Sequence, residues 1–132
     1  MTDRLSEENR EALVAYRMER ARQSLEEAAI MREAAHYNAA INRLYYACFY
    51  AASALLINNA IEAGTHKGVR AMLSLNFILA GKIDKEHGKT FSELNEKRNS
   101  NDYDDFIYCD LTTVNHYYPR VEAFITAVEA LL

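Results

Sequence analysis

The sequence has little proline and glycine, with one proline and four glycines in 132 residues. Few positions are therefore suited to tight turns, and no segment shows the alternation of apolar and polar residues that a half-buried β-strand requires. The two cysteines, Cys48 and Cys109, lie far apart and form no Cys-x-x-Cys pair, which argues against a disulfide framework or a zinc site. Cys48 is expected to be a small buried hydrophobe. The chain is predicted to be nearly all helical.

An excess of basic residues and an uninterrupted apolar run of membrane-spanning length are also missing. Nineteen acidic residues against fifteen basic ones give a net charge of −4, which opposes the diffuse attraction to phosphate that drives nonspecific nucleic-acid binding. Any contact with RNA must therefore be local. With a mean hydropathy of −0.28, we expect neither a membrane-spanning helix nor a secretory signal, and a cytoplasmic protein. Residues 1–132 are expected to form a single domain.

Apolar residues recur at three- and four-residue spacing in several segments, as in amphipathic helices. The strongest pattern runs from Tyr37 to Ile61, where two apolar stripes cover nearly the whole circumference and the only charge is Arg43. A helix that is apolar nearly all round is either the central helix of a bundle or packs against a second subunit. This helix has more apolar surface than a small bundle easily covers, and we therefore expect a homodimer.

The remaining helices are placed by their start and stop signals. Caps are expected at Ser6 and Thr65, and stops at Gly64 and Gly81. A short helix is predicted from Asp84 to about Arg98, followed by a polar loop or helix end over residues 99–105. The last helix either is kinked near Pro119 or begins there. Together the segments predict an all-α, antiparallel up-and-down bundle of four to five helices.

A metal site is the first kind of chemistry to consider in a helical bundle. Glu33 and His36 have the Glu-x-x-His spacing of di-iron bundles, but such sites need a second pair and two further inward carboxylates. The expected core stripes carry no second pair and no carboxylate, so the segment with Glu33 and His36 is interpreted as the boundary between the first two helices. The sequence has neither a P-loop nor a Gly-rich dinucleotide loop. We expect no metal and no cofactor.

The strongest candidate for chemistry is the run from Arg98 to Asp105, in which one guanidinium precedes three carboxylates and a phenol. Arginine binds phosphate bidentately. The structural alternative, which composition alone favours, is a helix C-terminus at which Arg98 complements the dipole before a polar turn. His66 could supply an imidazole to a cleft, although a capping or packing role is favoured. The tyrosines of the central helix could stack bases, but core or dimer packing is the favoured use.

Three segments, in order along nearly the whole chain, resemble the HEPN domain family. Residues 43–56 begin with Arg-Leu-Tyr-Tyr-Ala, residues 66–70 read His-Lys-Gly-Val-Arg, and residues 98–103 match the Arg-x-x-x-Asp-Tyr signature of an uncharacterised prokaryotic branch. The resemblance implies an antiparallel bundle that pairs through a two-fold interface, with the Arg motif of both subunits around a shared cleft. Such proteins are often encoded beside minimal nucleotidyltransferases.

The sequence departs from the active members of that family at one position. In those members, an Arg followed after four to six residues by a His makes a metal-independent ribonuclease: the Arg stabilises phosphate and transition-state charge, and the His transfers a proton at the ribose 2′-hydroxyl. Here the three corresponding positions hold Tyr103, Asp104 and Asp105. A phenol, whose ordinary pKa is ~10, is no base at neutral pH. Asp102 could accept a proton, but a solvated carboxyl group with the ordinary pKa of ~3.9 is a weak base.

The sequence therefore predicts a homodimeric HEPN-type module that binds RNA or nucleotide phosphate through Arg98, Asn99, Tyr103 and His66. The resemblance links it to a toxin–antitoxin or nucleotidyltransferase system, with a minimal nucleotidyltransferase antitoxin as the partner and no role for a membrane. Two alternatives stay open. One is a metal-independent ribonuclease toxin that lacks the usual His, in which Arg98 and Asp102 or His66 are catalytic. The other is a purely structural partner protein.

Overall fold

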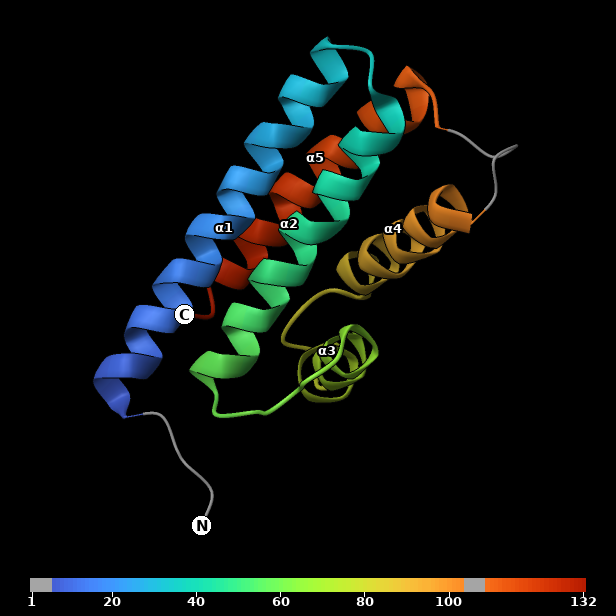
Figure 1. The fold of residues 1–132 in the computed structure, drawn as a ribbon. Helices are drawn as coiled ribbons and strands as arrows, with labels where there is room; N and C mark the ends of the chain where they lie inside the picture. Colours follow the sequence, from blue (N-terminus) through green and yellow to red (C-terminus); the bar gives the residue numbers. More distant parts are fainter. Residues whose placement is uncertain (1–5, 104–108) are drawn as a thin grey trace.

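The computed structural model describes residues 6–103 and 109–132, and the side chains of all of these except residues 100–103. Within this part of the chain the regular structure is helical and contains no strand (Figure 1). The elements are α1 (Glu7–Glu33), α2 (Tyr37–Asn58), α3 (His66–Leu73), the π-helical turn η1 (Ser74–Ile78), α4 (Lys85–Tyr103) and α5 (Leu111–Glu129). The predicted all-α class is confirmed.

The long helices run alternately up and down the bundle in the order α1, α2, α4, α5 (Figure 1). The pair α1 and α2 lies in front of α5, α4 flanks α2, and α3 runs across the bundle and is seen nearly end-on. The central helix is α2, because it contacts each of the other four α-helices. The predicted antiparallel bundle with a central second helix is therefore confirmed.

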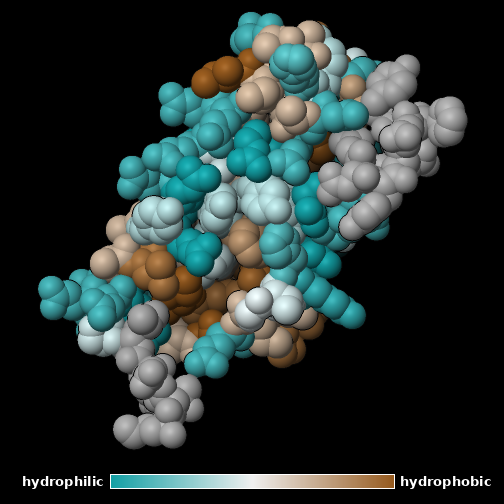
Figure 2. Space-filling view, viewed as in Figure 1, coloured by the Kyte–Doolittle hydropathy of each residue, from teal (hydrophilic) through white to brown (hydrophobic). Residues whose placement is uncertain are grey.

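Both apolar stripes of α2 are largely covered within one chain. The first stripe supplies fully buried core residues such as Leu44, Cys48 and Leu55, and the second packs half-buried tyrosines, Tyr46 and Tyr50, against the core. The surrounding helices therefore cover most of the apolar surface of α2, but an apolar hollow remains at its C-terminal end, where Figure 2 shows hydrophobic residues at the surface. The homodimer remains a prediction. By length and composition α2 could cross a membrane, but most of it is buried, and burial is the ordinary reason for such a composition.

Two predicted helix caps are present. The side chain of Ser6 accepts a hydrogen bond from Asn9 N at 3.1 Å, and that of Thr65 accepts one from Gly68 N at 2.9 Å. The predicted end of the central helix at Gly64 is wrong, since α2 ends at Asn58. Ala60 is left-handed there, with φ of 57°, and a left-handed residue after the last turn closes a helix.

The last two helices differ from expectation at their ends. The backbone of α4 continues to Tyr103. Of the two alternatives for residues 99–105, the helix end therefore agrees with the structure and a loop over residues 99–103 does not, while residues 104 and 105 lie outside the described residues. Helix α5 begins at Leu111, and Pro119 lies inside it, so a helix start at that proline is wrong. Its cap is Asp110, whose side chain accepts from Thr113 N at 2.9 Å. Pro119 removes only one intrahelical hydrogen bond.

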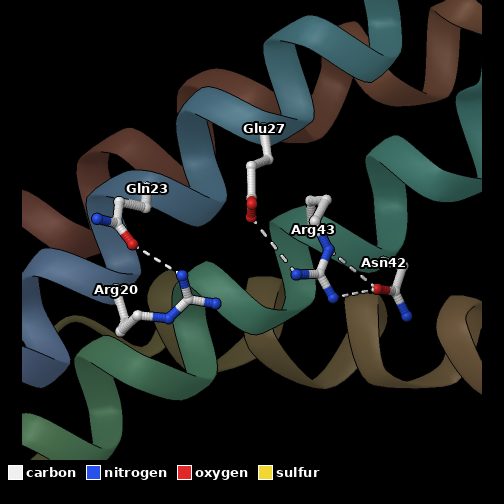
Figure 3. Close-up of polar contacts among 5 residues, drawn as sticks. All are labelled: Arg20, Gln23, Glu27, Asn42 and Arg43. Atoms are coloured by element: carbon white, nitrogen blue, oxygen red, sulfur yellow. Dashed lines mark hydrogen bonds and ion pairs between the residues drawn. The ribbon is translucent and has the colours of Figure 1, made fainter.

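Polar contacts along α1 and α2 are shown in Figure 3. Arg43, which opens the first HEPN-like segment, lies 3.5 Å from Glu27 of α1 and donates to Asn42 Oδ1 at 2.7 Å. Its guanidinium also lies over the Tyr46 ring at 5.0 Å. On α1, Arg20 donates to Gln23 at 2.7 Å. Arg43 therefore adds one ion pair to the packing between α1 and α2.

Ala35, between α1 and α2, offers a test of local backbone strain. Its φ is 62°, a conformation that favours glycine over an L-residue with a Cβ. Ala35→Gly is expected to raise the free energy of unfolding by about 1 kcal/mol, which chemical denaturation measures. The neighbouring Ala34→Gly is the control, because Ala34 has φ of −83° and gains nothing from glycine. Equal effects of the two substitutions on the free energy of unfolding would contradict backbone strain at Ala35.

Candidate functional site

Three chemistry-bearing side chains from two helices meet around a fully buried tyrosine, Tyr45 of α2. The Arg98 guanidinium from α4 lies 4.5 Å from the centre of its ring. The Nδ1 atom of His66, from α3, lies 2.8 Å from its hydroxyl and is hydrogen-bonded to it. Arg70, one turn further along α3, completes what we call the Tyr45 cluster: Tyr45, His66, Arg70 and Arg98.

The ring of His66 is held by aromatic packing. It stacks on Phe49, with ring centres 4.2 Å apart and 23° between the planes, and meets Tyr46 edge-on at 5.7 Å. Thr65 provides the cap of α3, so His66 does not cap the helix. The packing role favoured from the sequence is confirmed, and the same packing places the imidazole beside Arg98.

Arg70 is positioned from α4. Its Nη1 donates to Asn95 Oδ1 at 3.2 Å, and its positive charge acts on both His66 and Tyr45. Because residues 66 and 70 are four apart, they share one face of α3. Two guanidinium groups from different helices therefore act on the same tyrosine.

The electrostatics of the cluster favour an anion. Burial, with the charges of Arg98 and Arg70, lowers the pKa of His66 below its ordinary value, so the imidazole is neutral at pH 7. Burial raises the pKa of Tyr45 although the same two charges oppose it, so the phenol stays protonated. The cluster thus combines two fixed positive charges with a neutral imidazole, and it can bind phosphate and accept a proton.

The structure brings together two of the residues predicted for the site and separates a third from them. Arg98 is half-buried and lies in the Tyr45 cluster with His66, whereas Asn99 is exposed. The side chains of Asp102 and Tyr103 lie outside the described residues. The cluster residues missed from the sequence are Tyr45 and Arg70, although the three HEPN-like segments contain both.

Other candidates for chemistry lie elsewhere. Glu33 and His36 are both exposed at the boundary between α1 and α2, and within the described ranges no group of three or more His, Cys, Asp or Glu residues could hold a metal ion. Cys48 is fully buried, and burial raises the pKa of its thiol. It is a small buried hydrophobe, as predicted, rather than a nucleophile.

Comparison with known proteins identifies the family. The model of the HEPN domain matches residues 14–131. A UPF0332 protein of Thermotoga maritima is 32% identical over 123 residues, which is 93% of each chain. Two proteins of Methanocaldococcus jannaschii described as candidate toxins are each 33% identical to this chain. The first matches over 99 residues, which is 75% of this chain and 73% of the relative. The second matches over 87 residues, which is 66% of this chain and 59% of the relative. The chain therefore belongs to the HEPN domain family.

Proposed function

We propose that this HEPN module binds the phosphate of RNA or of a nucleotide at the Tyr45 cluster. The observation that carries the proposal is the convergence of Arg98 and Arg70 on one buried tyrosine. In a protein of net charge −4, such a local pair of guanidinium groups offers a phosphate the bidentate bonds that arginine forms best.

The binding experiment uses fluorescently labelled single-stranded RNA without divalent metal. We expect saturable binding that weakens as salt rises, because counterions leave the RNA when cations bind its phosphates. Unlabelled nucleoside monophosphate and inorganic phosphate are expected to compete. Absence of RNA binding at low salt would overturn the proposal.

The proposed context is a cytoplasmic toxin–antitoxin system with a minimal nucleotidyltransferase as the antitoxin. Two relatives described as candidate toxins support it.

A homodimer is proposed with the Tyr45 cluster of each copy at a shared cleft. Leu75 and Leu79, which are 58% and 75% exposed, provide apolar surface that a second copy could cover. Sedimentation is expected to give twice the chain mass of 15.1 kDa; a monomer at micromolar concentration would contradict the dimer.

A second candidate function is metal-independent RNA cleavage, and the position of His66 favours it. When its Nδ1–H donates to the Tyr45 oxygen, Nε2 keeps a free lone pair. That nitrogen would take the proton of a ribose 2′-hydroxyl, and the oxygen would attack the adjacent phosphorus. The 5′-oxygen would leave with a proton from water, and a 2′,3′-cyclic phosphate would remain. Arg98 and Arg70 would stabilise the charge that develops on the phosphoryl oxygens.

The pH dependence of cleavage distinguishes this candidate. The base must be neutral, and the pKa of His66 lies below its ordinary 6.5. The cleavage rate is therefore expected to rise with pH through that lowered pKa and to be flat at neutral pH. His66→Gln is expected to abolish cleavage in the presence of EDTA while RNA affinity changes less than about threefold. Cleavage that persists in His66→Gln would exclude this base.

A further inference from the structure

A groove of about 390 Å³ lies between α3 and α4, beside the Tyr45 cluster. Arg70 belongs to both, since it lines the groove and acts on Tyr45. Phe91 links them as well: it lines the groove, and its ring centre lies 5.7 Å from that of Tyr45. The groove and the Tyr45 cluster therefore adjoin at these two residues.

The lining of the groove is cationic. Lys67 and Arg70 come from α3 and Lys85 comes from α4, and two serine hydroxyls, of Ser74 and Ser92, lie between them. None of the residues that line it is acidic. In the described part of the chain neither lysine forms an ion pair. Three positive charges thus gather in one groove of a protein with an overall negative charge.

Helix stability does not explain these charges. Lys67 lies in the first turn of α3, and this turn has no acidic residue. The N-terminal end of a helix carries a partial positive charge, which disfavours a lysine at this position. A surface selected only for stability would place an acidic residue at that position. The placement of Lys67 instead suits an anion that enters the groove.

One face of α4 extends the cationic groove toward Arg98. Lys85, Gly88, Ser92, Asn95 and Arg98 recur at three- and four-residue spacing and so share a face. At 1.5 Å per residue this face is about 20 Å long, several times the size of one phosphate group.

The floor of the groove depends on close packing between η1 and α4. A Cβ atom at Gly88 would lie 2.4 Å from Ile78 Cδ1, so glycine permits η1 to approach α4. The wider turn of η1 contributes Ser74 and Ile78 to the lining. Such π-helical turns occur frequently at functional sites.

We propose that this groove is a second phosphate-binding subsite and that the ligand of the Tyr45 cluster is a single-stranded RNA segment of several nucleotides. The inference rests on the proposed function: one phosphate lies at Arg98 and Arg70, and a neighbouring phosphate of the same strand lies at Lys67 and Lys85.

The test compares uridine monophosphate with labelled oligouridylates of two, four and eight nucleotides. The wild-type affinity is expected to rise with length and then level off. Lys67→Gln together with Lys85→Gln is expected to weaken binding of the octamer about tenfold or more, and to reduce the slope of log affinity against log salt by about 1.4. The same pair of substitutions is expected to leave competition by uridine monophosphate unchanged.

The matched control is Lys89→Gln together with Lys97→Gln, which removes two positive charges from α4 outside the groove lining. It is expected to change octamer affinity by less than about threefold. Affinity that does not depend on length, or equal losses in the two double variants, would overturn the subsite while the phosphate site at Arg98 stands. A wild-type protein that binds neither uridine monophosphate nor the octamer would overturn both proposals.

Discussion

Arg98→Ala is expected to lower the affinity for single-stranded RNA about 10- to 100-fold and to leave the fold intact. The guanidinium would supply charge-assisted hydrogen bonds to phosphate, each worth about 1.5–3 kcal/mol, and 1.4 kcal/mol is a factor of ten in affinity. Its contribution to stability is smaller: the half-buried side chain lies 4.5 Å above Tyr45, a contact worth about 1 kcal/mol. Fluorescence anisotropy and thermal melting measure the two effects separately.

The neighbouring residue provides the control. Lys97→Ala removes the same charge from the same helix, but Lys97 lies over Tyr117, 5.9 Å from its ring centre, on the side facing α5. We expect its RNA affinity to change less than about threefold. An Arg98→Ala protein that binds RNA like the wild type would refute the phosphate role. If Arg98→Ala lowers the melting temperature strongly, and the wild type neither binds nor cleaves RNA, the role of Arg98 is structural.

Tyr45→Ala is expected to cost about 3–5 kcal/mol of unfolding free energy, the range for removal of a large buried aromatic side chain. Tyr45 is fully buried, and its ring lies 5.1 Å from that of Tyr46 and 5.7 Å from that of Phe91. Since domains of this kind are stable by about 5–15 kcal/mol, the loss is a large part of the total. Urea denaturation measures it.

Two further substitutions separate the ring from its hydroxyl. Tyr45→Phe keeps the surface beneath Arg98 and removes the hydroxyl, which is hydrogen-bonded to His66 and Arg70, so we expect a cost of about 1 kcal/mol and an RNA affinity within about threefold of the wild type. Tyr16→Ala is the control for loss of a tyrosine at an exposed position, since Tyr16 is 56% exposed; its expected cost is below about 0.5 kcal/mol. Similar costs for Tyr45→Ala and Tyr16→Ala would contradict a structural centre at Tyr45.

The helical bundle was predictable because its strongest signal is local. The near absence of charge between Asn38 and Ile61 identified the central helix, and the caps at Ser6 and Thr65 lie where their side chains suggested. The polar segment at residues 99–105 was expected to be a loop or a helix end, and α4 ends within it, at Tyr103. The asparagine and serine residues before that end each cost a helix less than about 0.7 kcal/mol. A helix that is already formed can continue through them.

The site was only half predictable, because residues from three helices build it. Arg98 and His66 were identified from their chemistry and from the family resemblance, but nothing in their spacing showed that both contact Tyr45. Tyr45 was assigned to core packing, which is correct, and the sequence did not indicate that the same ring supports a guanidinium. Arg70 reaches the cluster through its bond to Asn95, a contact between distant segments that depends on tertiary packing.

An NMR titration of the labelled protein with an eight-nucleotide single-stranded RNA tests the central claim most directly. The account predicts that the guanidinium signals of Arg98 and Arg70 and the ring signals of His66 shift together as RNA saturates the protein. The signals of Arg43, which bonds Asn42 and Glu27 at the contact between α1 and α2, should stay in place. RNA that binds while the signals of Arg98, Arg70 and His66 remain unchanged would contradict the account.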